Sequence, residues 1–391
     1  MVNVFTSPSR IIVTCSNRLA PYLEMELFEL NYQAVSTFKT GVELQGSVSD
    51  CIALNLNLQC ASQVLYSLRE MRARDPDELY GQLSLVPWES LIPQDGYLSV
   101  TSNVRTPSVN NELFVNVKVK DAIVDRIRDK TGKRPDSGAE LRGVVIHLYW
   151  KDEYAEIFVD TSGETLAKHG YRKIPGKAPM LESLAAATIL ATTWDKQTPF
   201  INPMCGSGTL AIEAALMATN RRPGLFRSNY GFMHVSGYQV AAYDKELALL
   251  REKVKEQPKL KIVATDNSLD AIRISKVNAE SAGVAHCIHF EKCDFEKTPM
   301  PAEGGGVVFF NPEYGERMGE VKALERTYHA IGDFMKNYCQ GYRGYVFTGN
   351  LDLAKKIGLK ASRRIEFYSA KIDCRLLRYD LYAGSRERGA S

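Results

Sequence analysis

The motif with the clearest chemical meaning stands at the end of a short apolar run, residues 307–310. Asn311, Pro312 and Tyr314 follow that run and place a side-chain amide, a prolyl carbonyl oxygen and an aromatic ring at one point. The two oxygens can accept both N–H bonds of a planar amino group while the ring stacks on the plane that carries it. Because Asn-Pro is also common turn chemistry, the motif predicts either a strand-ending turn or a site for an amino group conjugated to a base or an amide.

A glycine-containing loop lies upstream, at residues 202–209, after another short apolar run. Gly206 and Gly208 let the backbone turn sharply and approach a ligand closely, which favours a nucleotide-like cofactor. Thr209 stands where a phosphate-binding P-loop requires lysine, which argues against that site. The glycine spacing fits the fingerprint of a dinucleotide-binding fold only loosely. That fingerprint requires an acidic residue roughly 20 residues after the glycines, whereas the next acidic residue at a strand end, Asp266, comes much later. A tight turn without a ligand is the remaining alternative.

Polar side chains follow the next predicted strands at the point where each strand ends. Asp266 can accept from the hydroxyls of a ribose, and Asn267 adds a polar contact. Asp294 can accept from an adenine amino group beside the ring of Phe295. Each aspartate alone is also a common helix cap. Together they predict a cofactor site at the carboxyl ends of parallel strands, with these binding residues: Asn202, Cys205, Gly206, Gly208, Thr209, Asp266, Asn267, Asp294, Phe295 and Asn311.

The two motifs together predict methyl transfer to nitrogen. An exocyclic amino group must lose conjugation with its ring before it attacks a sulfonium methyl, and two acceptors, the Asn311 side-chain oxygen and the Pro312 carbonyl, favour that pyramidal nitrogen. Tyr314 is expected to hold the base in line by stacking, a form of positioning that contributes several kcal/mol. The catalytic set is therefore Asn311, Pro312 and Tyr314, without a separate strong base.

The elements that must position these residues fall into three expected domains, 1–60, 61–165 and 170–385. The first is a small α+β unit with strands at 10–15 and 42–44 and a helix at 20–30. The second contains a helix at 117–130 and a hairpin of 144–150 with 154–159. The third alternates strands and helices, which predicts a parallel sheet covered by helices. Its expected strands are 200–201, 261–265, 287–291, 307–310 and 345–348, closed by an antiparallel pair at 365–368 and 376–382. Its expected helices are 181–192, 209–220 and 268–282, with a long loop at 221–237.

Composition bounds the class of protein. The chain has 391 residues, a net charge of +3 and eight cysteines without a CxxC pair, so reduced thiols and a cytoplasmic location are expected. No apolar run reaches the roughly 18 residues of a membrane span, so no membrane association is expected. Cys287, His289 and Cys293 match no zinc spacing, and no metal is expected. Cys205 is expected to pack beneath the glycine loop rather than act as a nucleophile.

The motifs resemble those of the bacterial guanine-N2 RNA methyltransferases that carry an N-terminal THUMP domain, closest to the branch that acts on large-subunit ribosomal RNA. The similarity covers nearly the whole chain in order, and it is carried by 202–209 with 212–215, 311–317, 118–125, 160–163 with 170–172, 178–180 and 182–187. The resemblance implies a ferredoxin-like N-terminal unit, a THUMP RNA-binding domain and a Rossmann-like domain that uses S-adenosylmethionine. It also implies methylation of a guanine N2, with 23S ribosomal RNA as the expected substrate.

One residue departs from the family pattern, which usually has a second proline where this chain has Glu313. The acceptor pair is intact, but a carboxylate enters a site that should receive an anionic polymer. Glu313 turns outward to an arginine, or it alters the choice of substrate, or activity is lost. Three alternatives accompany the expected function. The substrate is transfer RNA, or another exocyclic or amide amino group; the chain is a non-catalytic RNA-binding or assembly factor; or, more remotely, it is a dehydrogenase that binds a nicotinamide cofactor.

Overall fold

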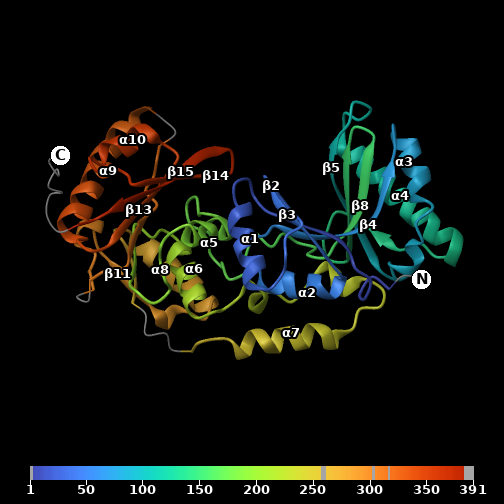
Figure 1. The fold of residues 1–391 in the computed structure, drawn as a ribbon, viewed down its shortest axis with the longest axis horizontal. Coiled ribbons are helices and arrows are strands. Elements are labelled where there is room, and N and C mark those ends of the chain that lie inside the picture. Colours follow the sequence, from blue (N-terminus) through green and yellow to red (C-terminus); the bar gives the residue numbers. More distant parts are fainter. Residues whose placement is uncertain (1–2, 257–260, 302–303, 316–317, 383–391) are drawn as a thin grey trace. The chain divides into compact units, whose positions relative to one another are not determined.

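The computed structural model describes residues 3–256, 261–301, 304–315 and 318–382 (Figure 1). The chain divides into two compact units. The first comprises Met1–Cys15, Leu23–Ala167 and Pro223–Glu252, and the second comprises Ser16–Tyr22, Lys168–Arg222 and Lys253–Ser391.

One eight-stranded sheet forms the centre of the first unit, with the order β2-β3-β1-β4-β8-β7-β5-β6. Neighbouring strands are antiparallel except for β5, which runs parallel to β7 and β6. Because β4 pairs with both β1 and β8, the expected segments 1–60 and 61–165 share a single sheet. Its strands are β1 (Ser9–Thr14), β2 (Ser36–Phe38), β3 (Gly41–Gly46), β4 (Gln63–Arg72), β5 (Tyr97–Arg105), β6 (Asp136–Ser137), β7 (Val144–Lys151) and β8 (Tyr154–Asp160).

The helices of this unit begin at side chains that cap them. Ser47 and Asp50 form a capping box at α2, and Asn111 accepts the N–H of Leu113, the second residue of α4;. Gly132, at φ 74°, ends α4 in a left-handed conformation;. The predicted helix at 117–130 is therefore confirmed but begins earlier, since its cap is Asn111. The elements are α1 (Ala20–Glu29), α2 (Val48–Asn57), α3 (Pro76–Leu83), α4 (Glu112–Thr131) and the short turn η1 (Trp88–Ser90).

The expected loop at 221–237 contains two short helical turns, η2 (Pro223–Phe226) and η3 (Gly231–His234). A helix that the sequence reading did not assign, α7 (Val240–Glu252), follows them. Leu250 is the one buried residue of α7, so the sequence of this helix lacks the periodic apolar positions from which an amphipathic helix is predicted;. The segment Pro223–Glu252 belongs to the first compact unit although it lies within the expected domain 170–385. The three domain boundaries stay a prediction.

A seven-stranded sheet with the order β11-β10-β9-β12-β13-β15-β14 forms the second unit. The first five strands in that order are parallel, and β15 is antiparallel to both β13 and β14. This confirms the predicted parallel sheet and its antiparallel closing pair. The strands are β9 (Phe200–Pro203), β10 (Ile262–Asp266), β11 (Ile288–Lys292), β12 (Val307–Phe310), β13 (Arg343–Thr348), β14 (Arg363–Ser369) and β15 (Ile372–Asp380).

Both faces of the central strands β9 and β12 of this sheet are buried. Val308 and Phe310 pack with α9 and α10 on one face, while Phe309 alternates to the other face and contacts Phe200 and Tyr345;. Strands that are buried on both faces consist of continuous apolar residues, and such apolar runs predicted these strands from the sequence. The helices are α5 (Glu182–Leu190), α6 (Thr209–Ala218), α8 (Leu269–Ser281), α9 (Met318–Tyr338) and α10 (Leu351–Lys356), with the turns η4 (Ala285–Cys287) and η5 (Phe295–Lys297).

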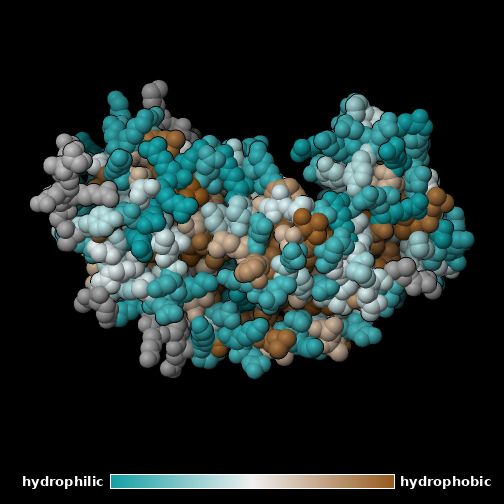
Figure 2. Space-filling model, viewed as in Figure 1, coloured by the Kyte–Doolittle hydropathy of each residue, from teal (hydrophilic) through white to brown (hydrophobic). Residues whose placement is uncertain are grey.

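The surface drawn in Figure 2 is mostly hydrophilic, and hydrophobic side chains gather on it in scattered groups. Across the described part of the chain, no helix combines the length and apolar character that crossing a membrane requires.

Candidate active site

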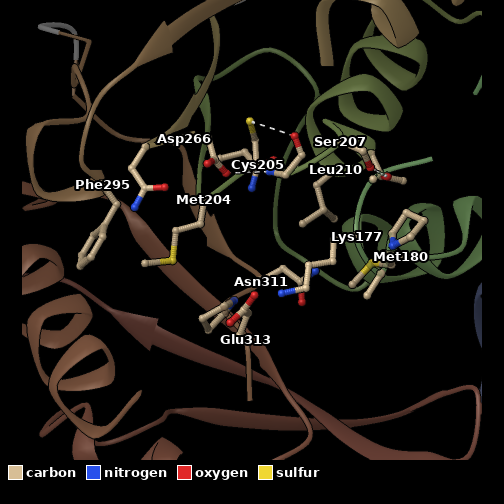
Figure 3. Close-up of a pocket in the computed structure, with 18 of the residues that line it drawn as sticks. Lys177, Met180, Met204, Cys205, Ser207, Leu210, Asp266, Phe295, Asn311 and Glu313 are labelled. Atoms are coloured by element: carbon tan, nitrogen blue, oxygen red, sulfur yellow. Dashed lines mark hydrogen bonds between the residues drawn. The ribbon is translucent and has the colours of Figure 1, made fainter. Parts of the chain in front are cut away.

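A cavity of about 450 Å³ opens at the carboxyl ends of β9, β10 and β12, where the strand order of the parallel sheet reverses. Doubly wound sheets bind their ligands at this point. Gly208, Asp294 and Tyr314 do not line the cavity. The other residues predicted from the sequence do line it (Figure 3): Asn202, Cys205, Gly206, Thr209, Asp266, Asn267, Phe295, Asn311 and Pro312.

The glycine loop needs its two glycines for different reasons. Gly206 has φ +57° and Gly208 has φ +82°, a region that side-chain-bearing residues adopt only with strain;. A Cβ on Gly208 would also lie 2.9 Å from the Cβ of Ser275 on α8, whereas one on Gly206 would meet open space. Ser275 donates a hydrogen bond to the Gly206 carbonyl at 2.7 Å. The loop therefore rests directly on α8, and α6 begins immediately after it.

Asp266 ends β10 with its half-buried side chain at the cavity wall. Its Oδ2 accepts the Gly206 N–H at 3.0 Å, and its Oδ1 accepts the Ser268 N–H at 2.9 Å. These bonds fix the carboxylate beside the glycine loop, and each oxygen keeps a lone pair for another donor. Two acceptor oxygens in one plane fit a pair of ribose hydroxyls.

Asn202, at the end of β9, carries an unpaired acceptor in this cavity. Its side chain is 1% exposed, and its Nδ2 donates to the Phe309 carbonyl at 2.9 Å, which fixes the orientation of the amide. Its Oδ1 has no hydrogen-bond partner in the described structure. A buried acceptor without a partner is unfavourable by about 1–3 kcal/mol, and a ligand donor removes that penalty. The residues present therefore fit a cofactor that carries an amino or hydroxyl donor.

Cys205 is buried, with its Sγ 3.7 Å from the Ser275 Oγ. Burial raises the pKa of its thiol to about 12, so the thiol stays protonated at neutral pH;. The predicted packing of Cys205 beneath the loop is in keeping with this environment. Within the described ranges, no three His, Cys, Asp or Glu side chains come close enough together to hold a metal ion.

Phe295 reaches the cavity from the turn that follows β11, and its ring meets Phe310 edge-on at a centroid distance of 6.1 Å. Asp294 precedes it and caps η5, with its side chain accepting the Glu296 N–H at 3.0 Å. The contact predicted between Asp294 and an adenine amino group stays a prediction.

Asn311, Pro312 and Glu313 form the part of the wall that follows β12 (Figure 3). Asn311 is half-buried, Pro312 is buried and Glu313 is exposed. Glu313 forms no ion pair with any residue of the described ranges, and Arg317 lies outside them. The amide of Asn311 thus stands in the same cavity as Asn202 and Asp266, although more than 100 residues separate β9 from β12 in the chain.

Tyr314 is half-buried, does not line the cavity and packs against the core cluster of the second unit. A Cβ on Gly349 would lie 3.2 Å from its ring, and its carbonyl accepts from the Asn350 Nδ2 at 3.3 Å. The stacking of Tyr314 on a target base stays a prediction, and it requires a slot next to the cavity described here.

The sequence reading missed two parts of the wall. Residues 176–180 cross it, with Ala178 at φ 91°, and Leu324 and Thr327 reach it from α9. Arg172 holds the first of these segments, since its Nη2 donates to the Met180 carbonyl at 2.6 Å. The available signal is the Gly-x-x-Pro pattern of residues 176–179 before β9, but this pattern carries no chemistry of its own, and only the family resemblance of 178–180 points to it.

Three family matches cover most of the chain. Residues 169–378 match the family described as an RMKL-like methyltransferase domain. Residues 73–160 match the THUMP domain, and residues 10–65 match the RlmL ferredoxin-like domain. The first match alone spans more than half of the 391 residues.

Two curated relatives are similar along nearly the full chain. A ribosomal RNA large subunit methyltransferase K/L from Syntrophotalea carbinolica is 35% identical over 384 residues, which are 96% of this chain and 54% of that protein. This chain thus spans about half the length of the K/L relatives it matches. A putative RNA methyltransferase from Synechocystis sp. is 29% identical over 381 residues, 97% of this chain and 99% of that protein.

Among solved structures, that of a putative methyltransferase complexed with SAH is similar with a TM-score of 0.87. The match covers 97% of this chain and all of that one at 24% sequence identity, which shows a shared fold.

Proposed function

This chain belongs to the family of RMKL-like methyltransferases with THUMP and ferredoxin-like N-terminal domains, and on that basis we propose that it methylates the exocyclic N2 of a guanine in RNA. S-adenosylmethionine is the proposed methyl donor, and 23S ribosomal RNA is the proposed substrate. The K/L relatives support this choice of RNA by the activity in their name. A cytoplasmic location follows from that substrate.

The observation that carries the proposal is the presence of Asn311 and Pro312 in the same cavity as Asn202 and Asp266. When bound, S-adenosylmethionine supplies an electrophilic methyl group on its sulfonium. The Asn311 side-chain oxygen and the Pro312 carbonyl oxygen each accept one N–H of the target amino group. Those bonds draw the nitrogen lone pair out of conjugation with the base and orient it.

The cofactor-binding residues act at the other side of the same cavity. Asp266 accepts from ribose hydroxyls, since its two oxygens are held by Gly206 and Ser268. Asn202 offers its unpartnered Oδ1 to a cofactor donor. The ring of Phe295 lies beside the base of the cofactor. No step of this scheme requires a protein base, because the methylated amine readily loses its extra proton to water.

The target guanine must leave its stack to reach this cavity, since a stacked base cannot present its N2 to a buried methyl group. The first unit, which holds the THUMP match, is proposed to grip the shape and phosphates of the RNA;.

The test is methyl transfer by the purified full chain to ribosomal RNA from cells that lack its gene, with mass mapping of the modified guanines. Asn311→Ala is expected to lower the transfer rate at least about 100-fold, because it removes one of the two acceptors that stabilise the reacting nitrogen. Its affinity for S-adenosylhomocysteine should stay within about threefold of wild type. Asn110→Ala, at an exposed loop position, is the matched control. Transfer at the wild-type rate by Asn311→Ala would refute the assigned role.

Transfer RNA guanine is the nearest alternative substrate, and transfer RNA in the same assay decides between the two. The exposed carboxylate of Glu313 on the cavity wall favours a second candidate, a non-catalytic RNA-binding factor. Tight cofactor binding without transfer to either RNA, together with transfer gained in Glu313→Pro, would establish that candidate.

A further inference from the structure

A second cavity, of about 480 Å³, lies on one face of the eight-stranded sheet in the first unit. We call it the sheet-face pocket. The residues that could contact a ligand there are Asn103, Arg105, His147, Tyr149, Tyr154 and Phe158, while the lining residues Arg10 and Glu156 neutralise each other in an ion pair. Its volume falls within the roughly 300–1,000 Å³ of small-ligand sites. None of the residues predicted from the sequence to bind cofactor or substrate lines it.

The strand register brings these residues to one face. Asn103 on β5 pairs with Tyr149 on β7, and His147 pairs with Phe158 on β8. Because side chains alternate along a strand, the intervening residues of β7 point to the opposite face. Leu148 and Trp150 are fully buried there, whereas Tyr149 stays partly exposed.

The floor of the pocket is apolar and aromatic. Ile12, Leu65 and Phe158 form a small buried cluster, and Tyr149 packs against it. Tyr154 is 37% exposed and meets the ring of Tyr149 edge-on, with centroids 6.4 Å apart. Because the planes of the two rings are inclined at 62°, one ring can stack on a flat base while the other meets the edge of that base;.

One cation, Arg105, lines the pocket, and a second, Lys151, lies next to it on the neighbouring strand, outside the lining. Arg105 ends β5, Lys151 ends β7, and they are register partners on the parallel pair of strands. Both side chains are exposed, and neither forms an ion pair with a described residue. The exposed amide of Asn103 lies beside them. Two cations without ion-pair partners, next to aromatic rings, are complementary to a nucleotide, because the cations attract its phosphate and the rings contact its base.

We propose that the sheet-face pocket holds an unpaired nucleotide of the RNA substrate. Its base stacks on the ring of Tyr149 and meets the ring of Tyr154 at its edge. Its phosphate meets Arg105 and Lys151, and Asn103 offers an amide to the base edge. The proposal rests on the proposed function for the identity of the polymer. It adds a second contact point, which reads an unpaired position away from the target guanine.

The ligand has to be single-stranded, because a base inside a duplex exposes no face to a tyrosine ring. Sheet surfaces with exposed aromatic side chains bind unpaired RNA bases in this way elsewhere. A duplex can meet the two cations but not the rings, so its affinity does not depend on the two tyrosines.

The test measures binding of a short labelled single-stranded RNA, and of a duplex of the same sequence, to the full chain by fluorescence anisotropy. Tyr149→Ala and Tyr154→Ala are each expected to weaken single-strand binding about 5–100-fold and to leave duplex binding within about twofold, since stacking contributes about 1–3 kcal/mol per base. Tyr80→Ala is the matched control, because Tyr80 lies on α3 and bonds Asp125 instead.

The contribution of Arg105 and Lys151 to RNA binding is measured from the salt dependence of the RNA affinity. The double variant Arg105→Gln/Lys151→Gln should reduce the slope of log affinity against log salt by about 0.7 per cation. Both side chains are exposed, so this variant folds even if Tyr149→Ala does not. Unchanged single-strand affinity in both tyrosine variants with an unchanged salt slope would overturn the proposal, as would an equal loss in Tyr80→Ala.

Methyl transfer measured on the same preparations keeps the two proposals apart. If the wild type methylates RNA and the pocket variants bind RNA like wild type, the sheet-face pocket alone is refuted. If the wild type binds single-stranded RNA through the pocket residues and transfers no methyl group, the proposed function alone is refuted.

Discussion

The two sheets of this protein place their cavities in different positions. In the parallel sheet of the second unit the cavity lies at the strand ends, beside Asn202, Asp266 and Asn311. In the first unit, whose sheet is mostly antiparallel, the cavity lies on the sheet face, over Tyr149 and Phe158. The difference follows from coverage, because crossover helices bury both faces of a parallel sheet and leave only the ends of its strands accessible.

This difference also separates the two kinds of side chain available to a ligand. Strand ends present backbone groups, short amides and carboxylates held by neighbouring N–H groups, as at Asp266. A sheet face presents side chains from adjacent strands at spacings of about 5 Å, which suits rings and long cations. Strand ends therefore favour the precise orientation of a reacting group, whereas a sheet face favours stacking that accepts different bases.

The largest expected effect tests the strand-end site. Asp266→Ala should weaken binding of S-adenosylhomocysteine about 30-fold, because charge-assisted hydrogen bonds contribute about 2 kcal/mol. Isothermal titration measures this, and single-stranded RNA affinity should not change. Asp270→Ala is the control, since Asp270 lies nearby in the first turn of α8 with a side chain 84% exposed. An equal loss of S-adenosylhomocysteine affinity in the two variants would mean that the net charge of the region, and not the position of Asp266, determines cofactor binding.

The next effect concerns the buried carboxylate of the first unit. Glu156 is 1% exposed, and its carboxylate accepts from Arg10 at 2.6 Å and from Ser67 at 2.6 Å. Arg10→Met should lower the free energy of unfolding by about 1–2 kcal/mol, a value reduced because Arg10 is 31% exposed;.

Urea unfolding measures this loss, and Arg10→Met/Glu156→Gln should recover part of it. Arg74→Met is the control, because its ion pair with Glu78 is exposed; we expect the stability of this variant to stay close to that of the wild type. A double variant less stable than Arg10→Met would contradict the proposed cause.

The smallest effect is a pH dependence of the sheet-face region. Burial lowers the pKa of His147 to about 4, below its ordinary value of 6.5. The unfolded chain therefore binds a proton that the folded chain does not, and stability falls as pH decreases from about 6.5 toward 4. His147→Gln should reduce the stability difference between pH 7 and pH 5 by about 1–2 kcal/mol.

Thermal or urea unfolding of the two proteins across this range is the measurement. The comparison with the variant isolates His147 from Asp160, whose pKa burial raises to about 6 and whose contribution has the opposite slope. Identical pH profiles would show that His147 is solvated in the folded protein.

Much of the parallel sheet could be predicted because its signals are local. Val307–Phe310 is an apolar run buried on both faces, and the structure has a strand with the same bounds. The helix α9 was also readable, since Leu324, Tyr328, Ile331 and Met335 recur at three- and four-residue spacing toward the core;. The prediction nevertheless omits α9, and also α2, β4 and β5, whose segments carry none of the chemical motifs.

The sequence alone determined the types of the reactive groups and their order along parallel strands, and therefore the edge of the sheet at which Asn202, Asp266 and Asn311 meet. Only the tertiary structure decided that Tyr314 packs against Gly349 and that Pro223–Glu252 joins the first unit. It alone also decided that Asn103, Tyr149 and Phe158 share one face. The physical reason is range: a strand end is set by the residues that follow it, whereas a sheet face is set by the hydrogen-bond register between distant segments.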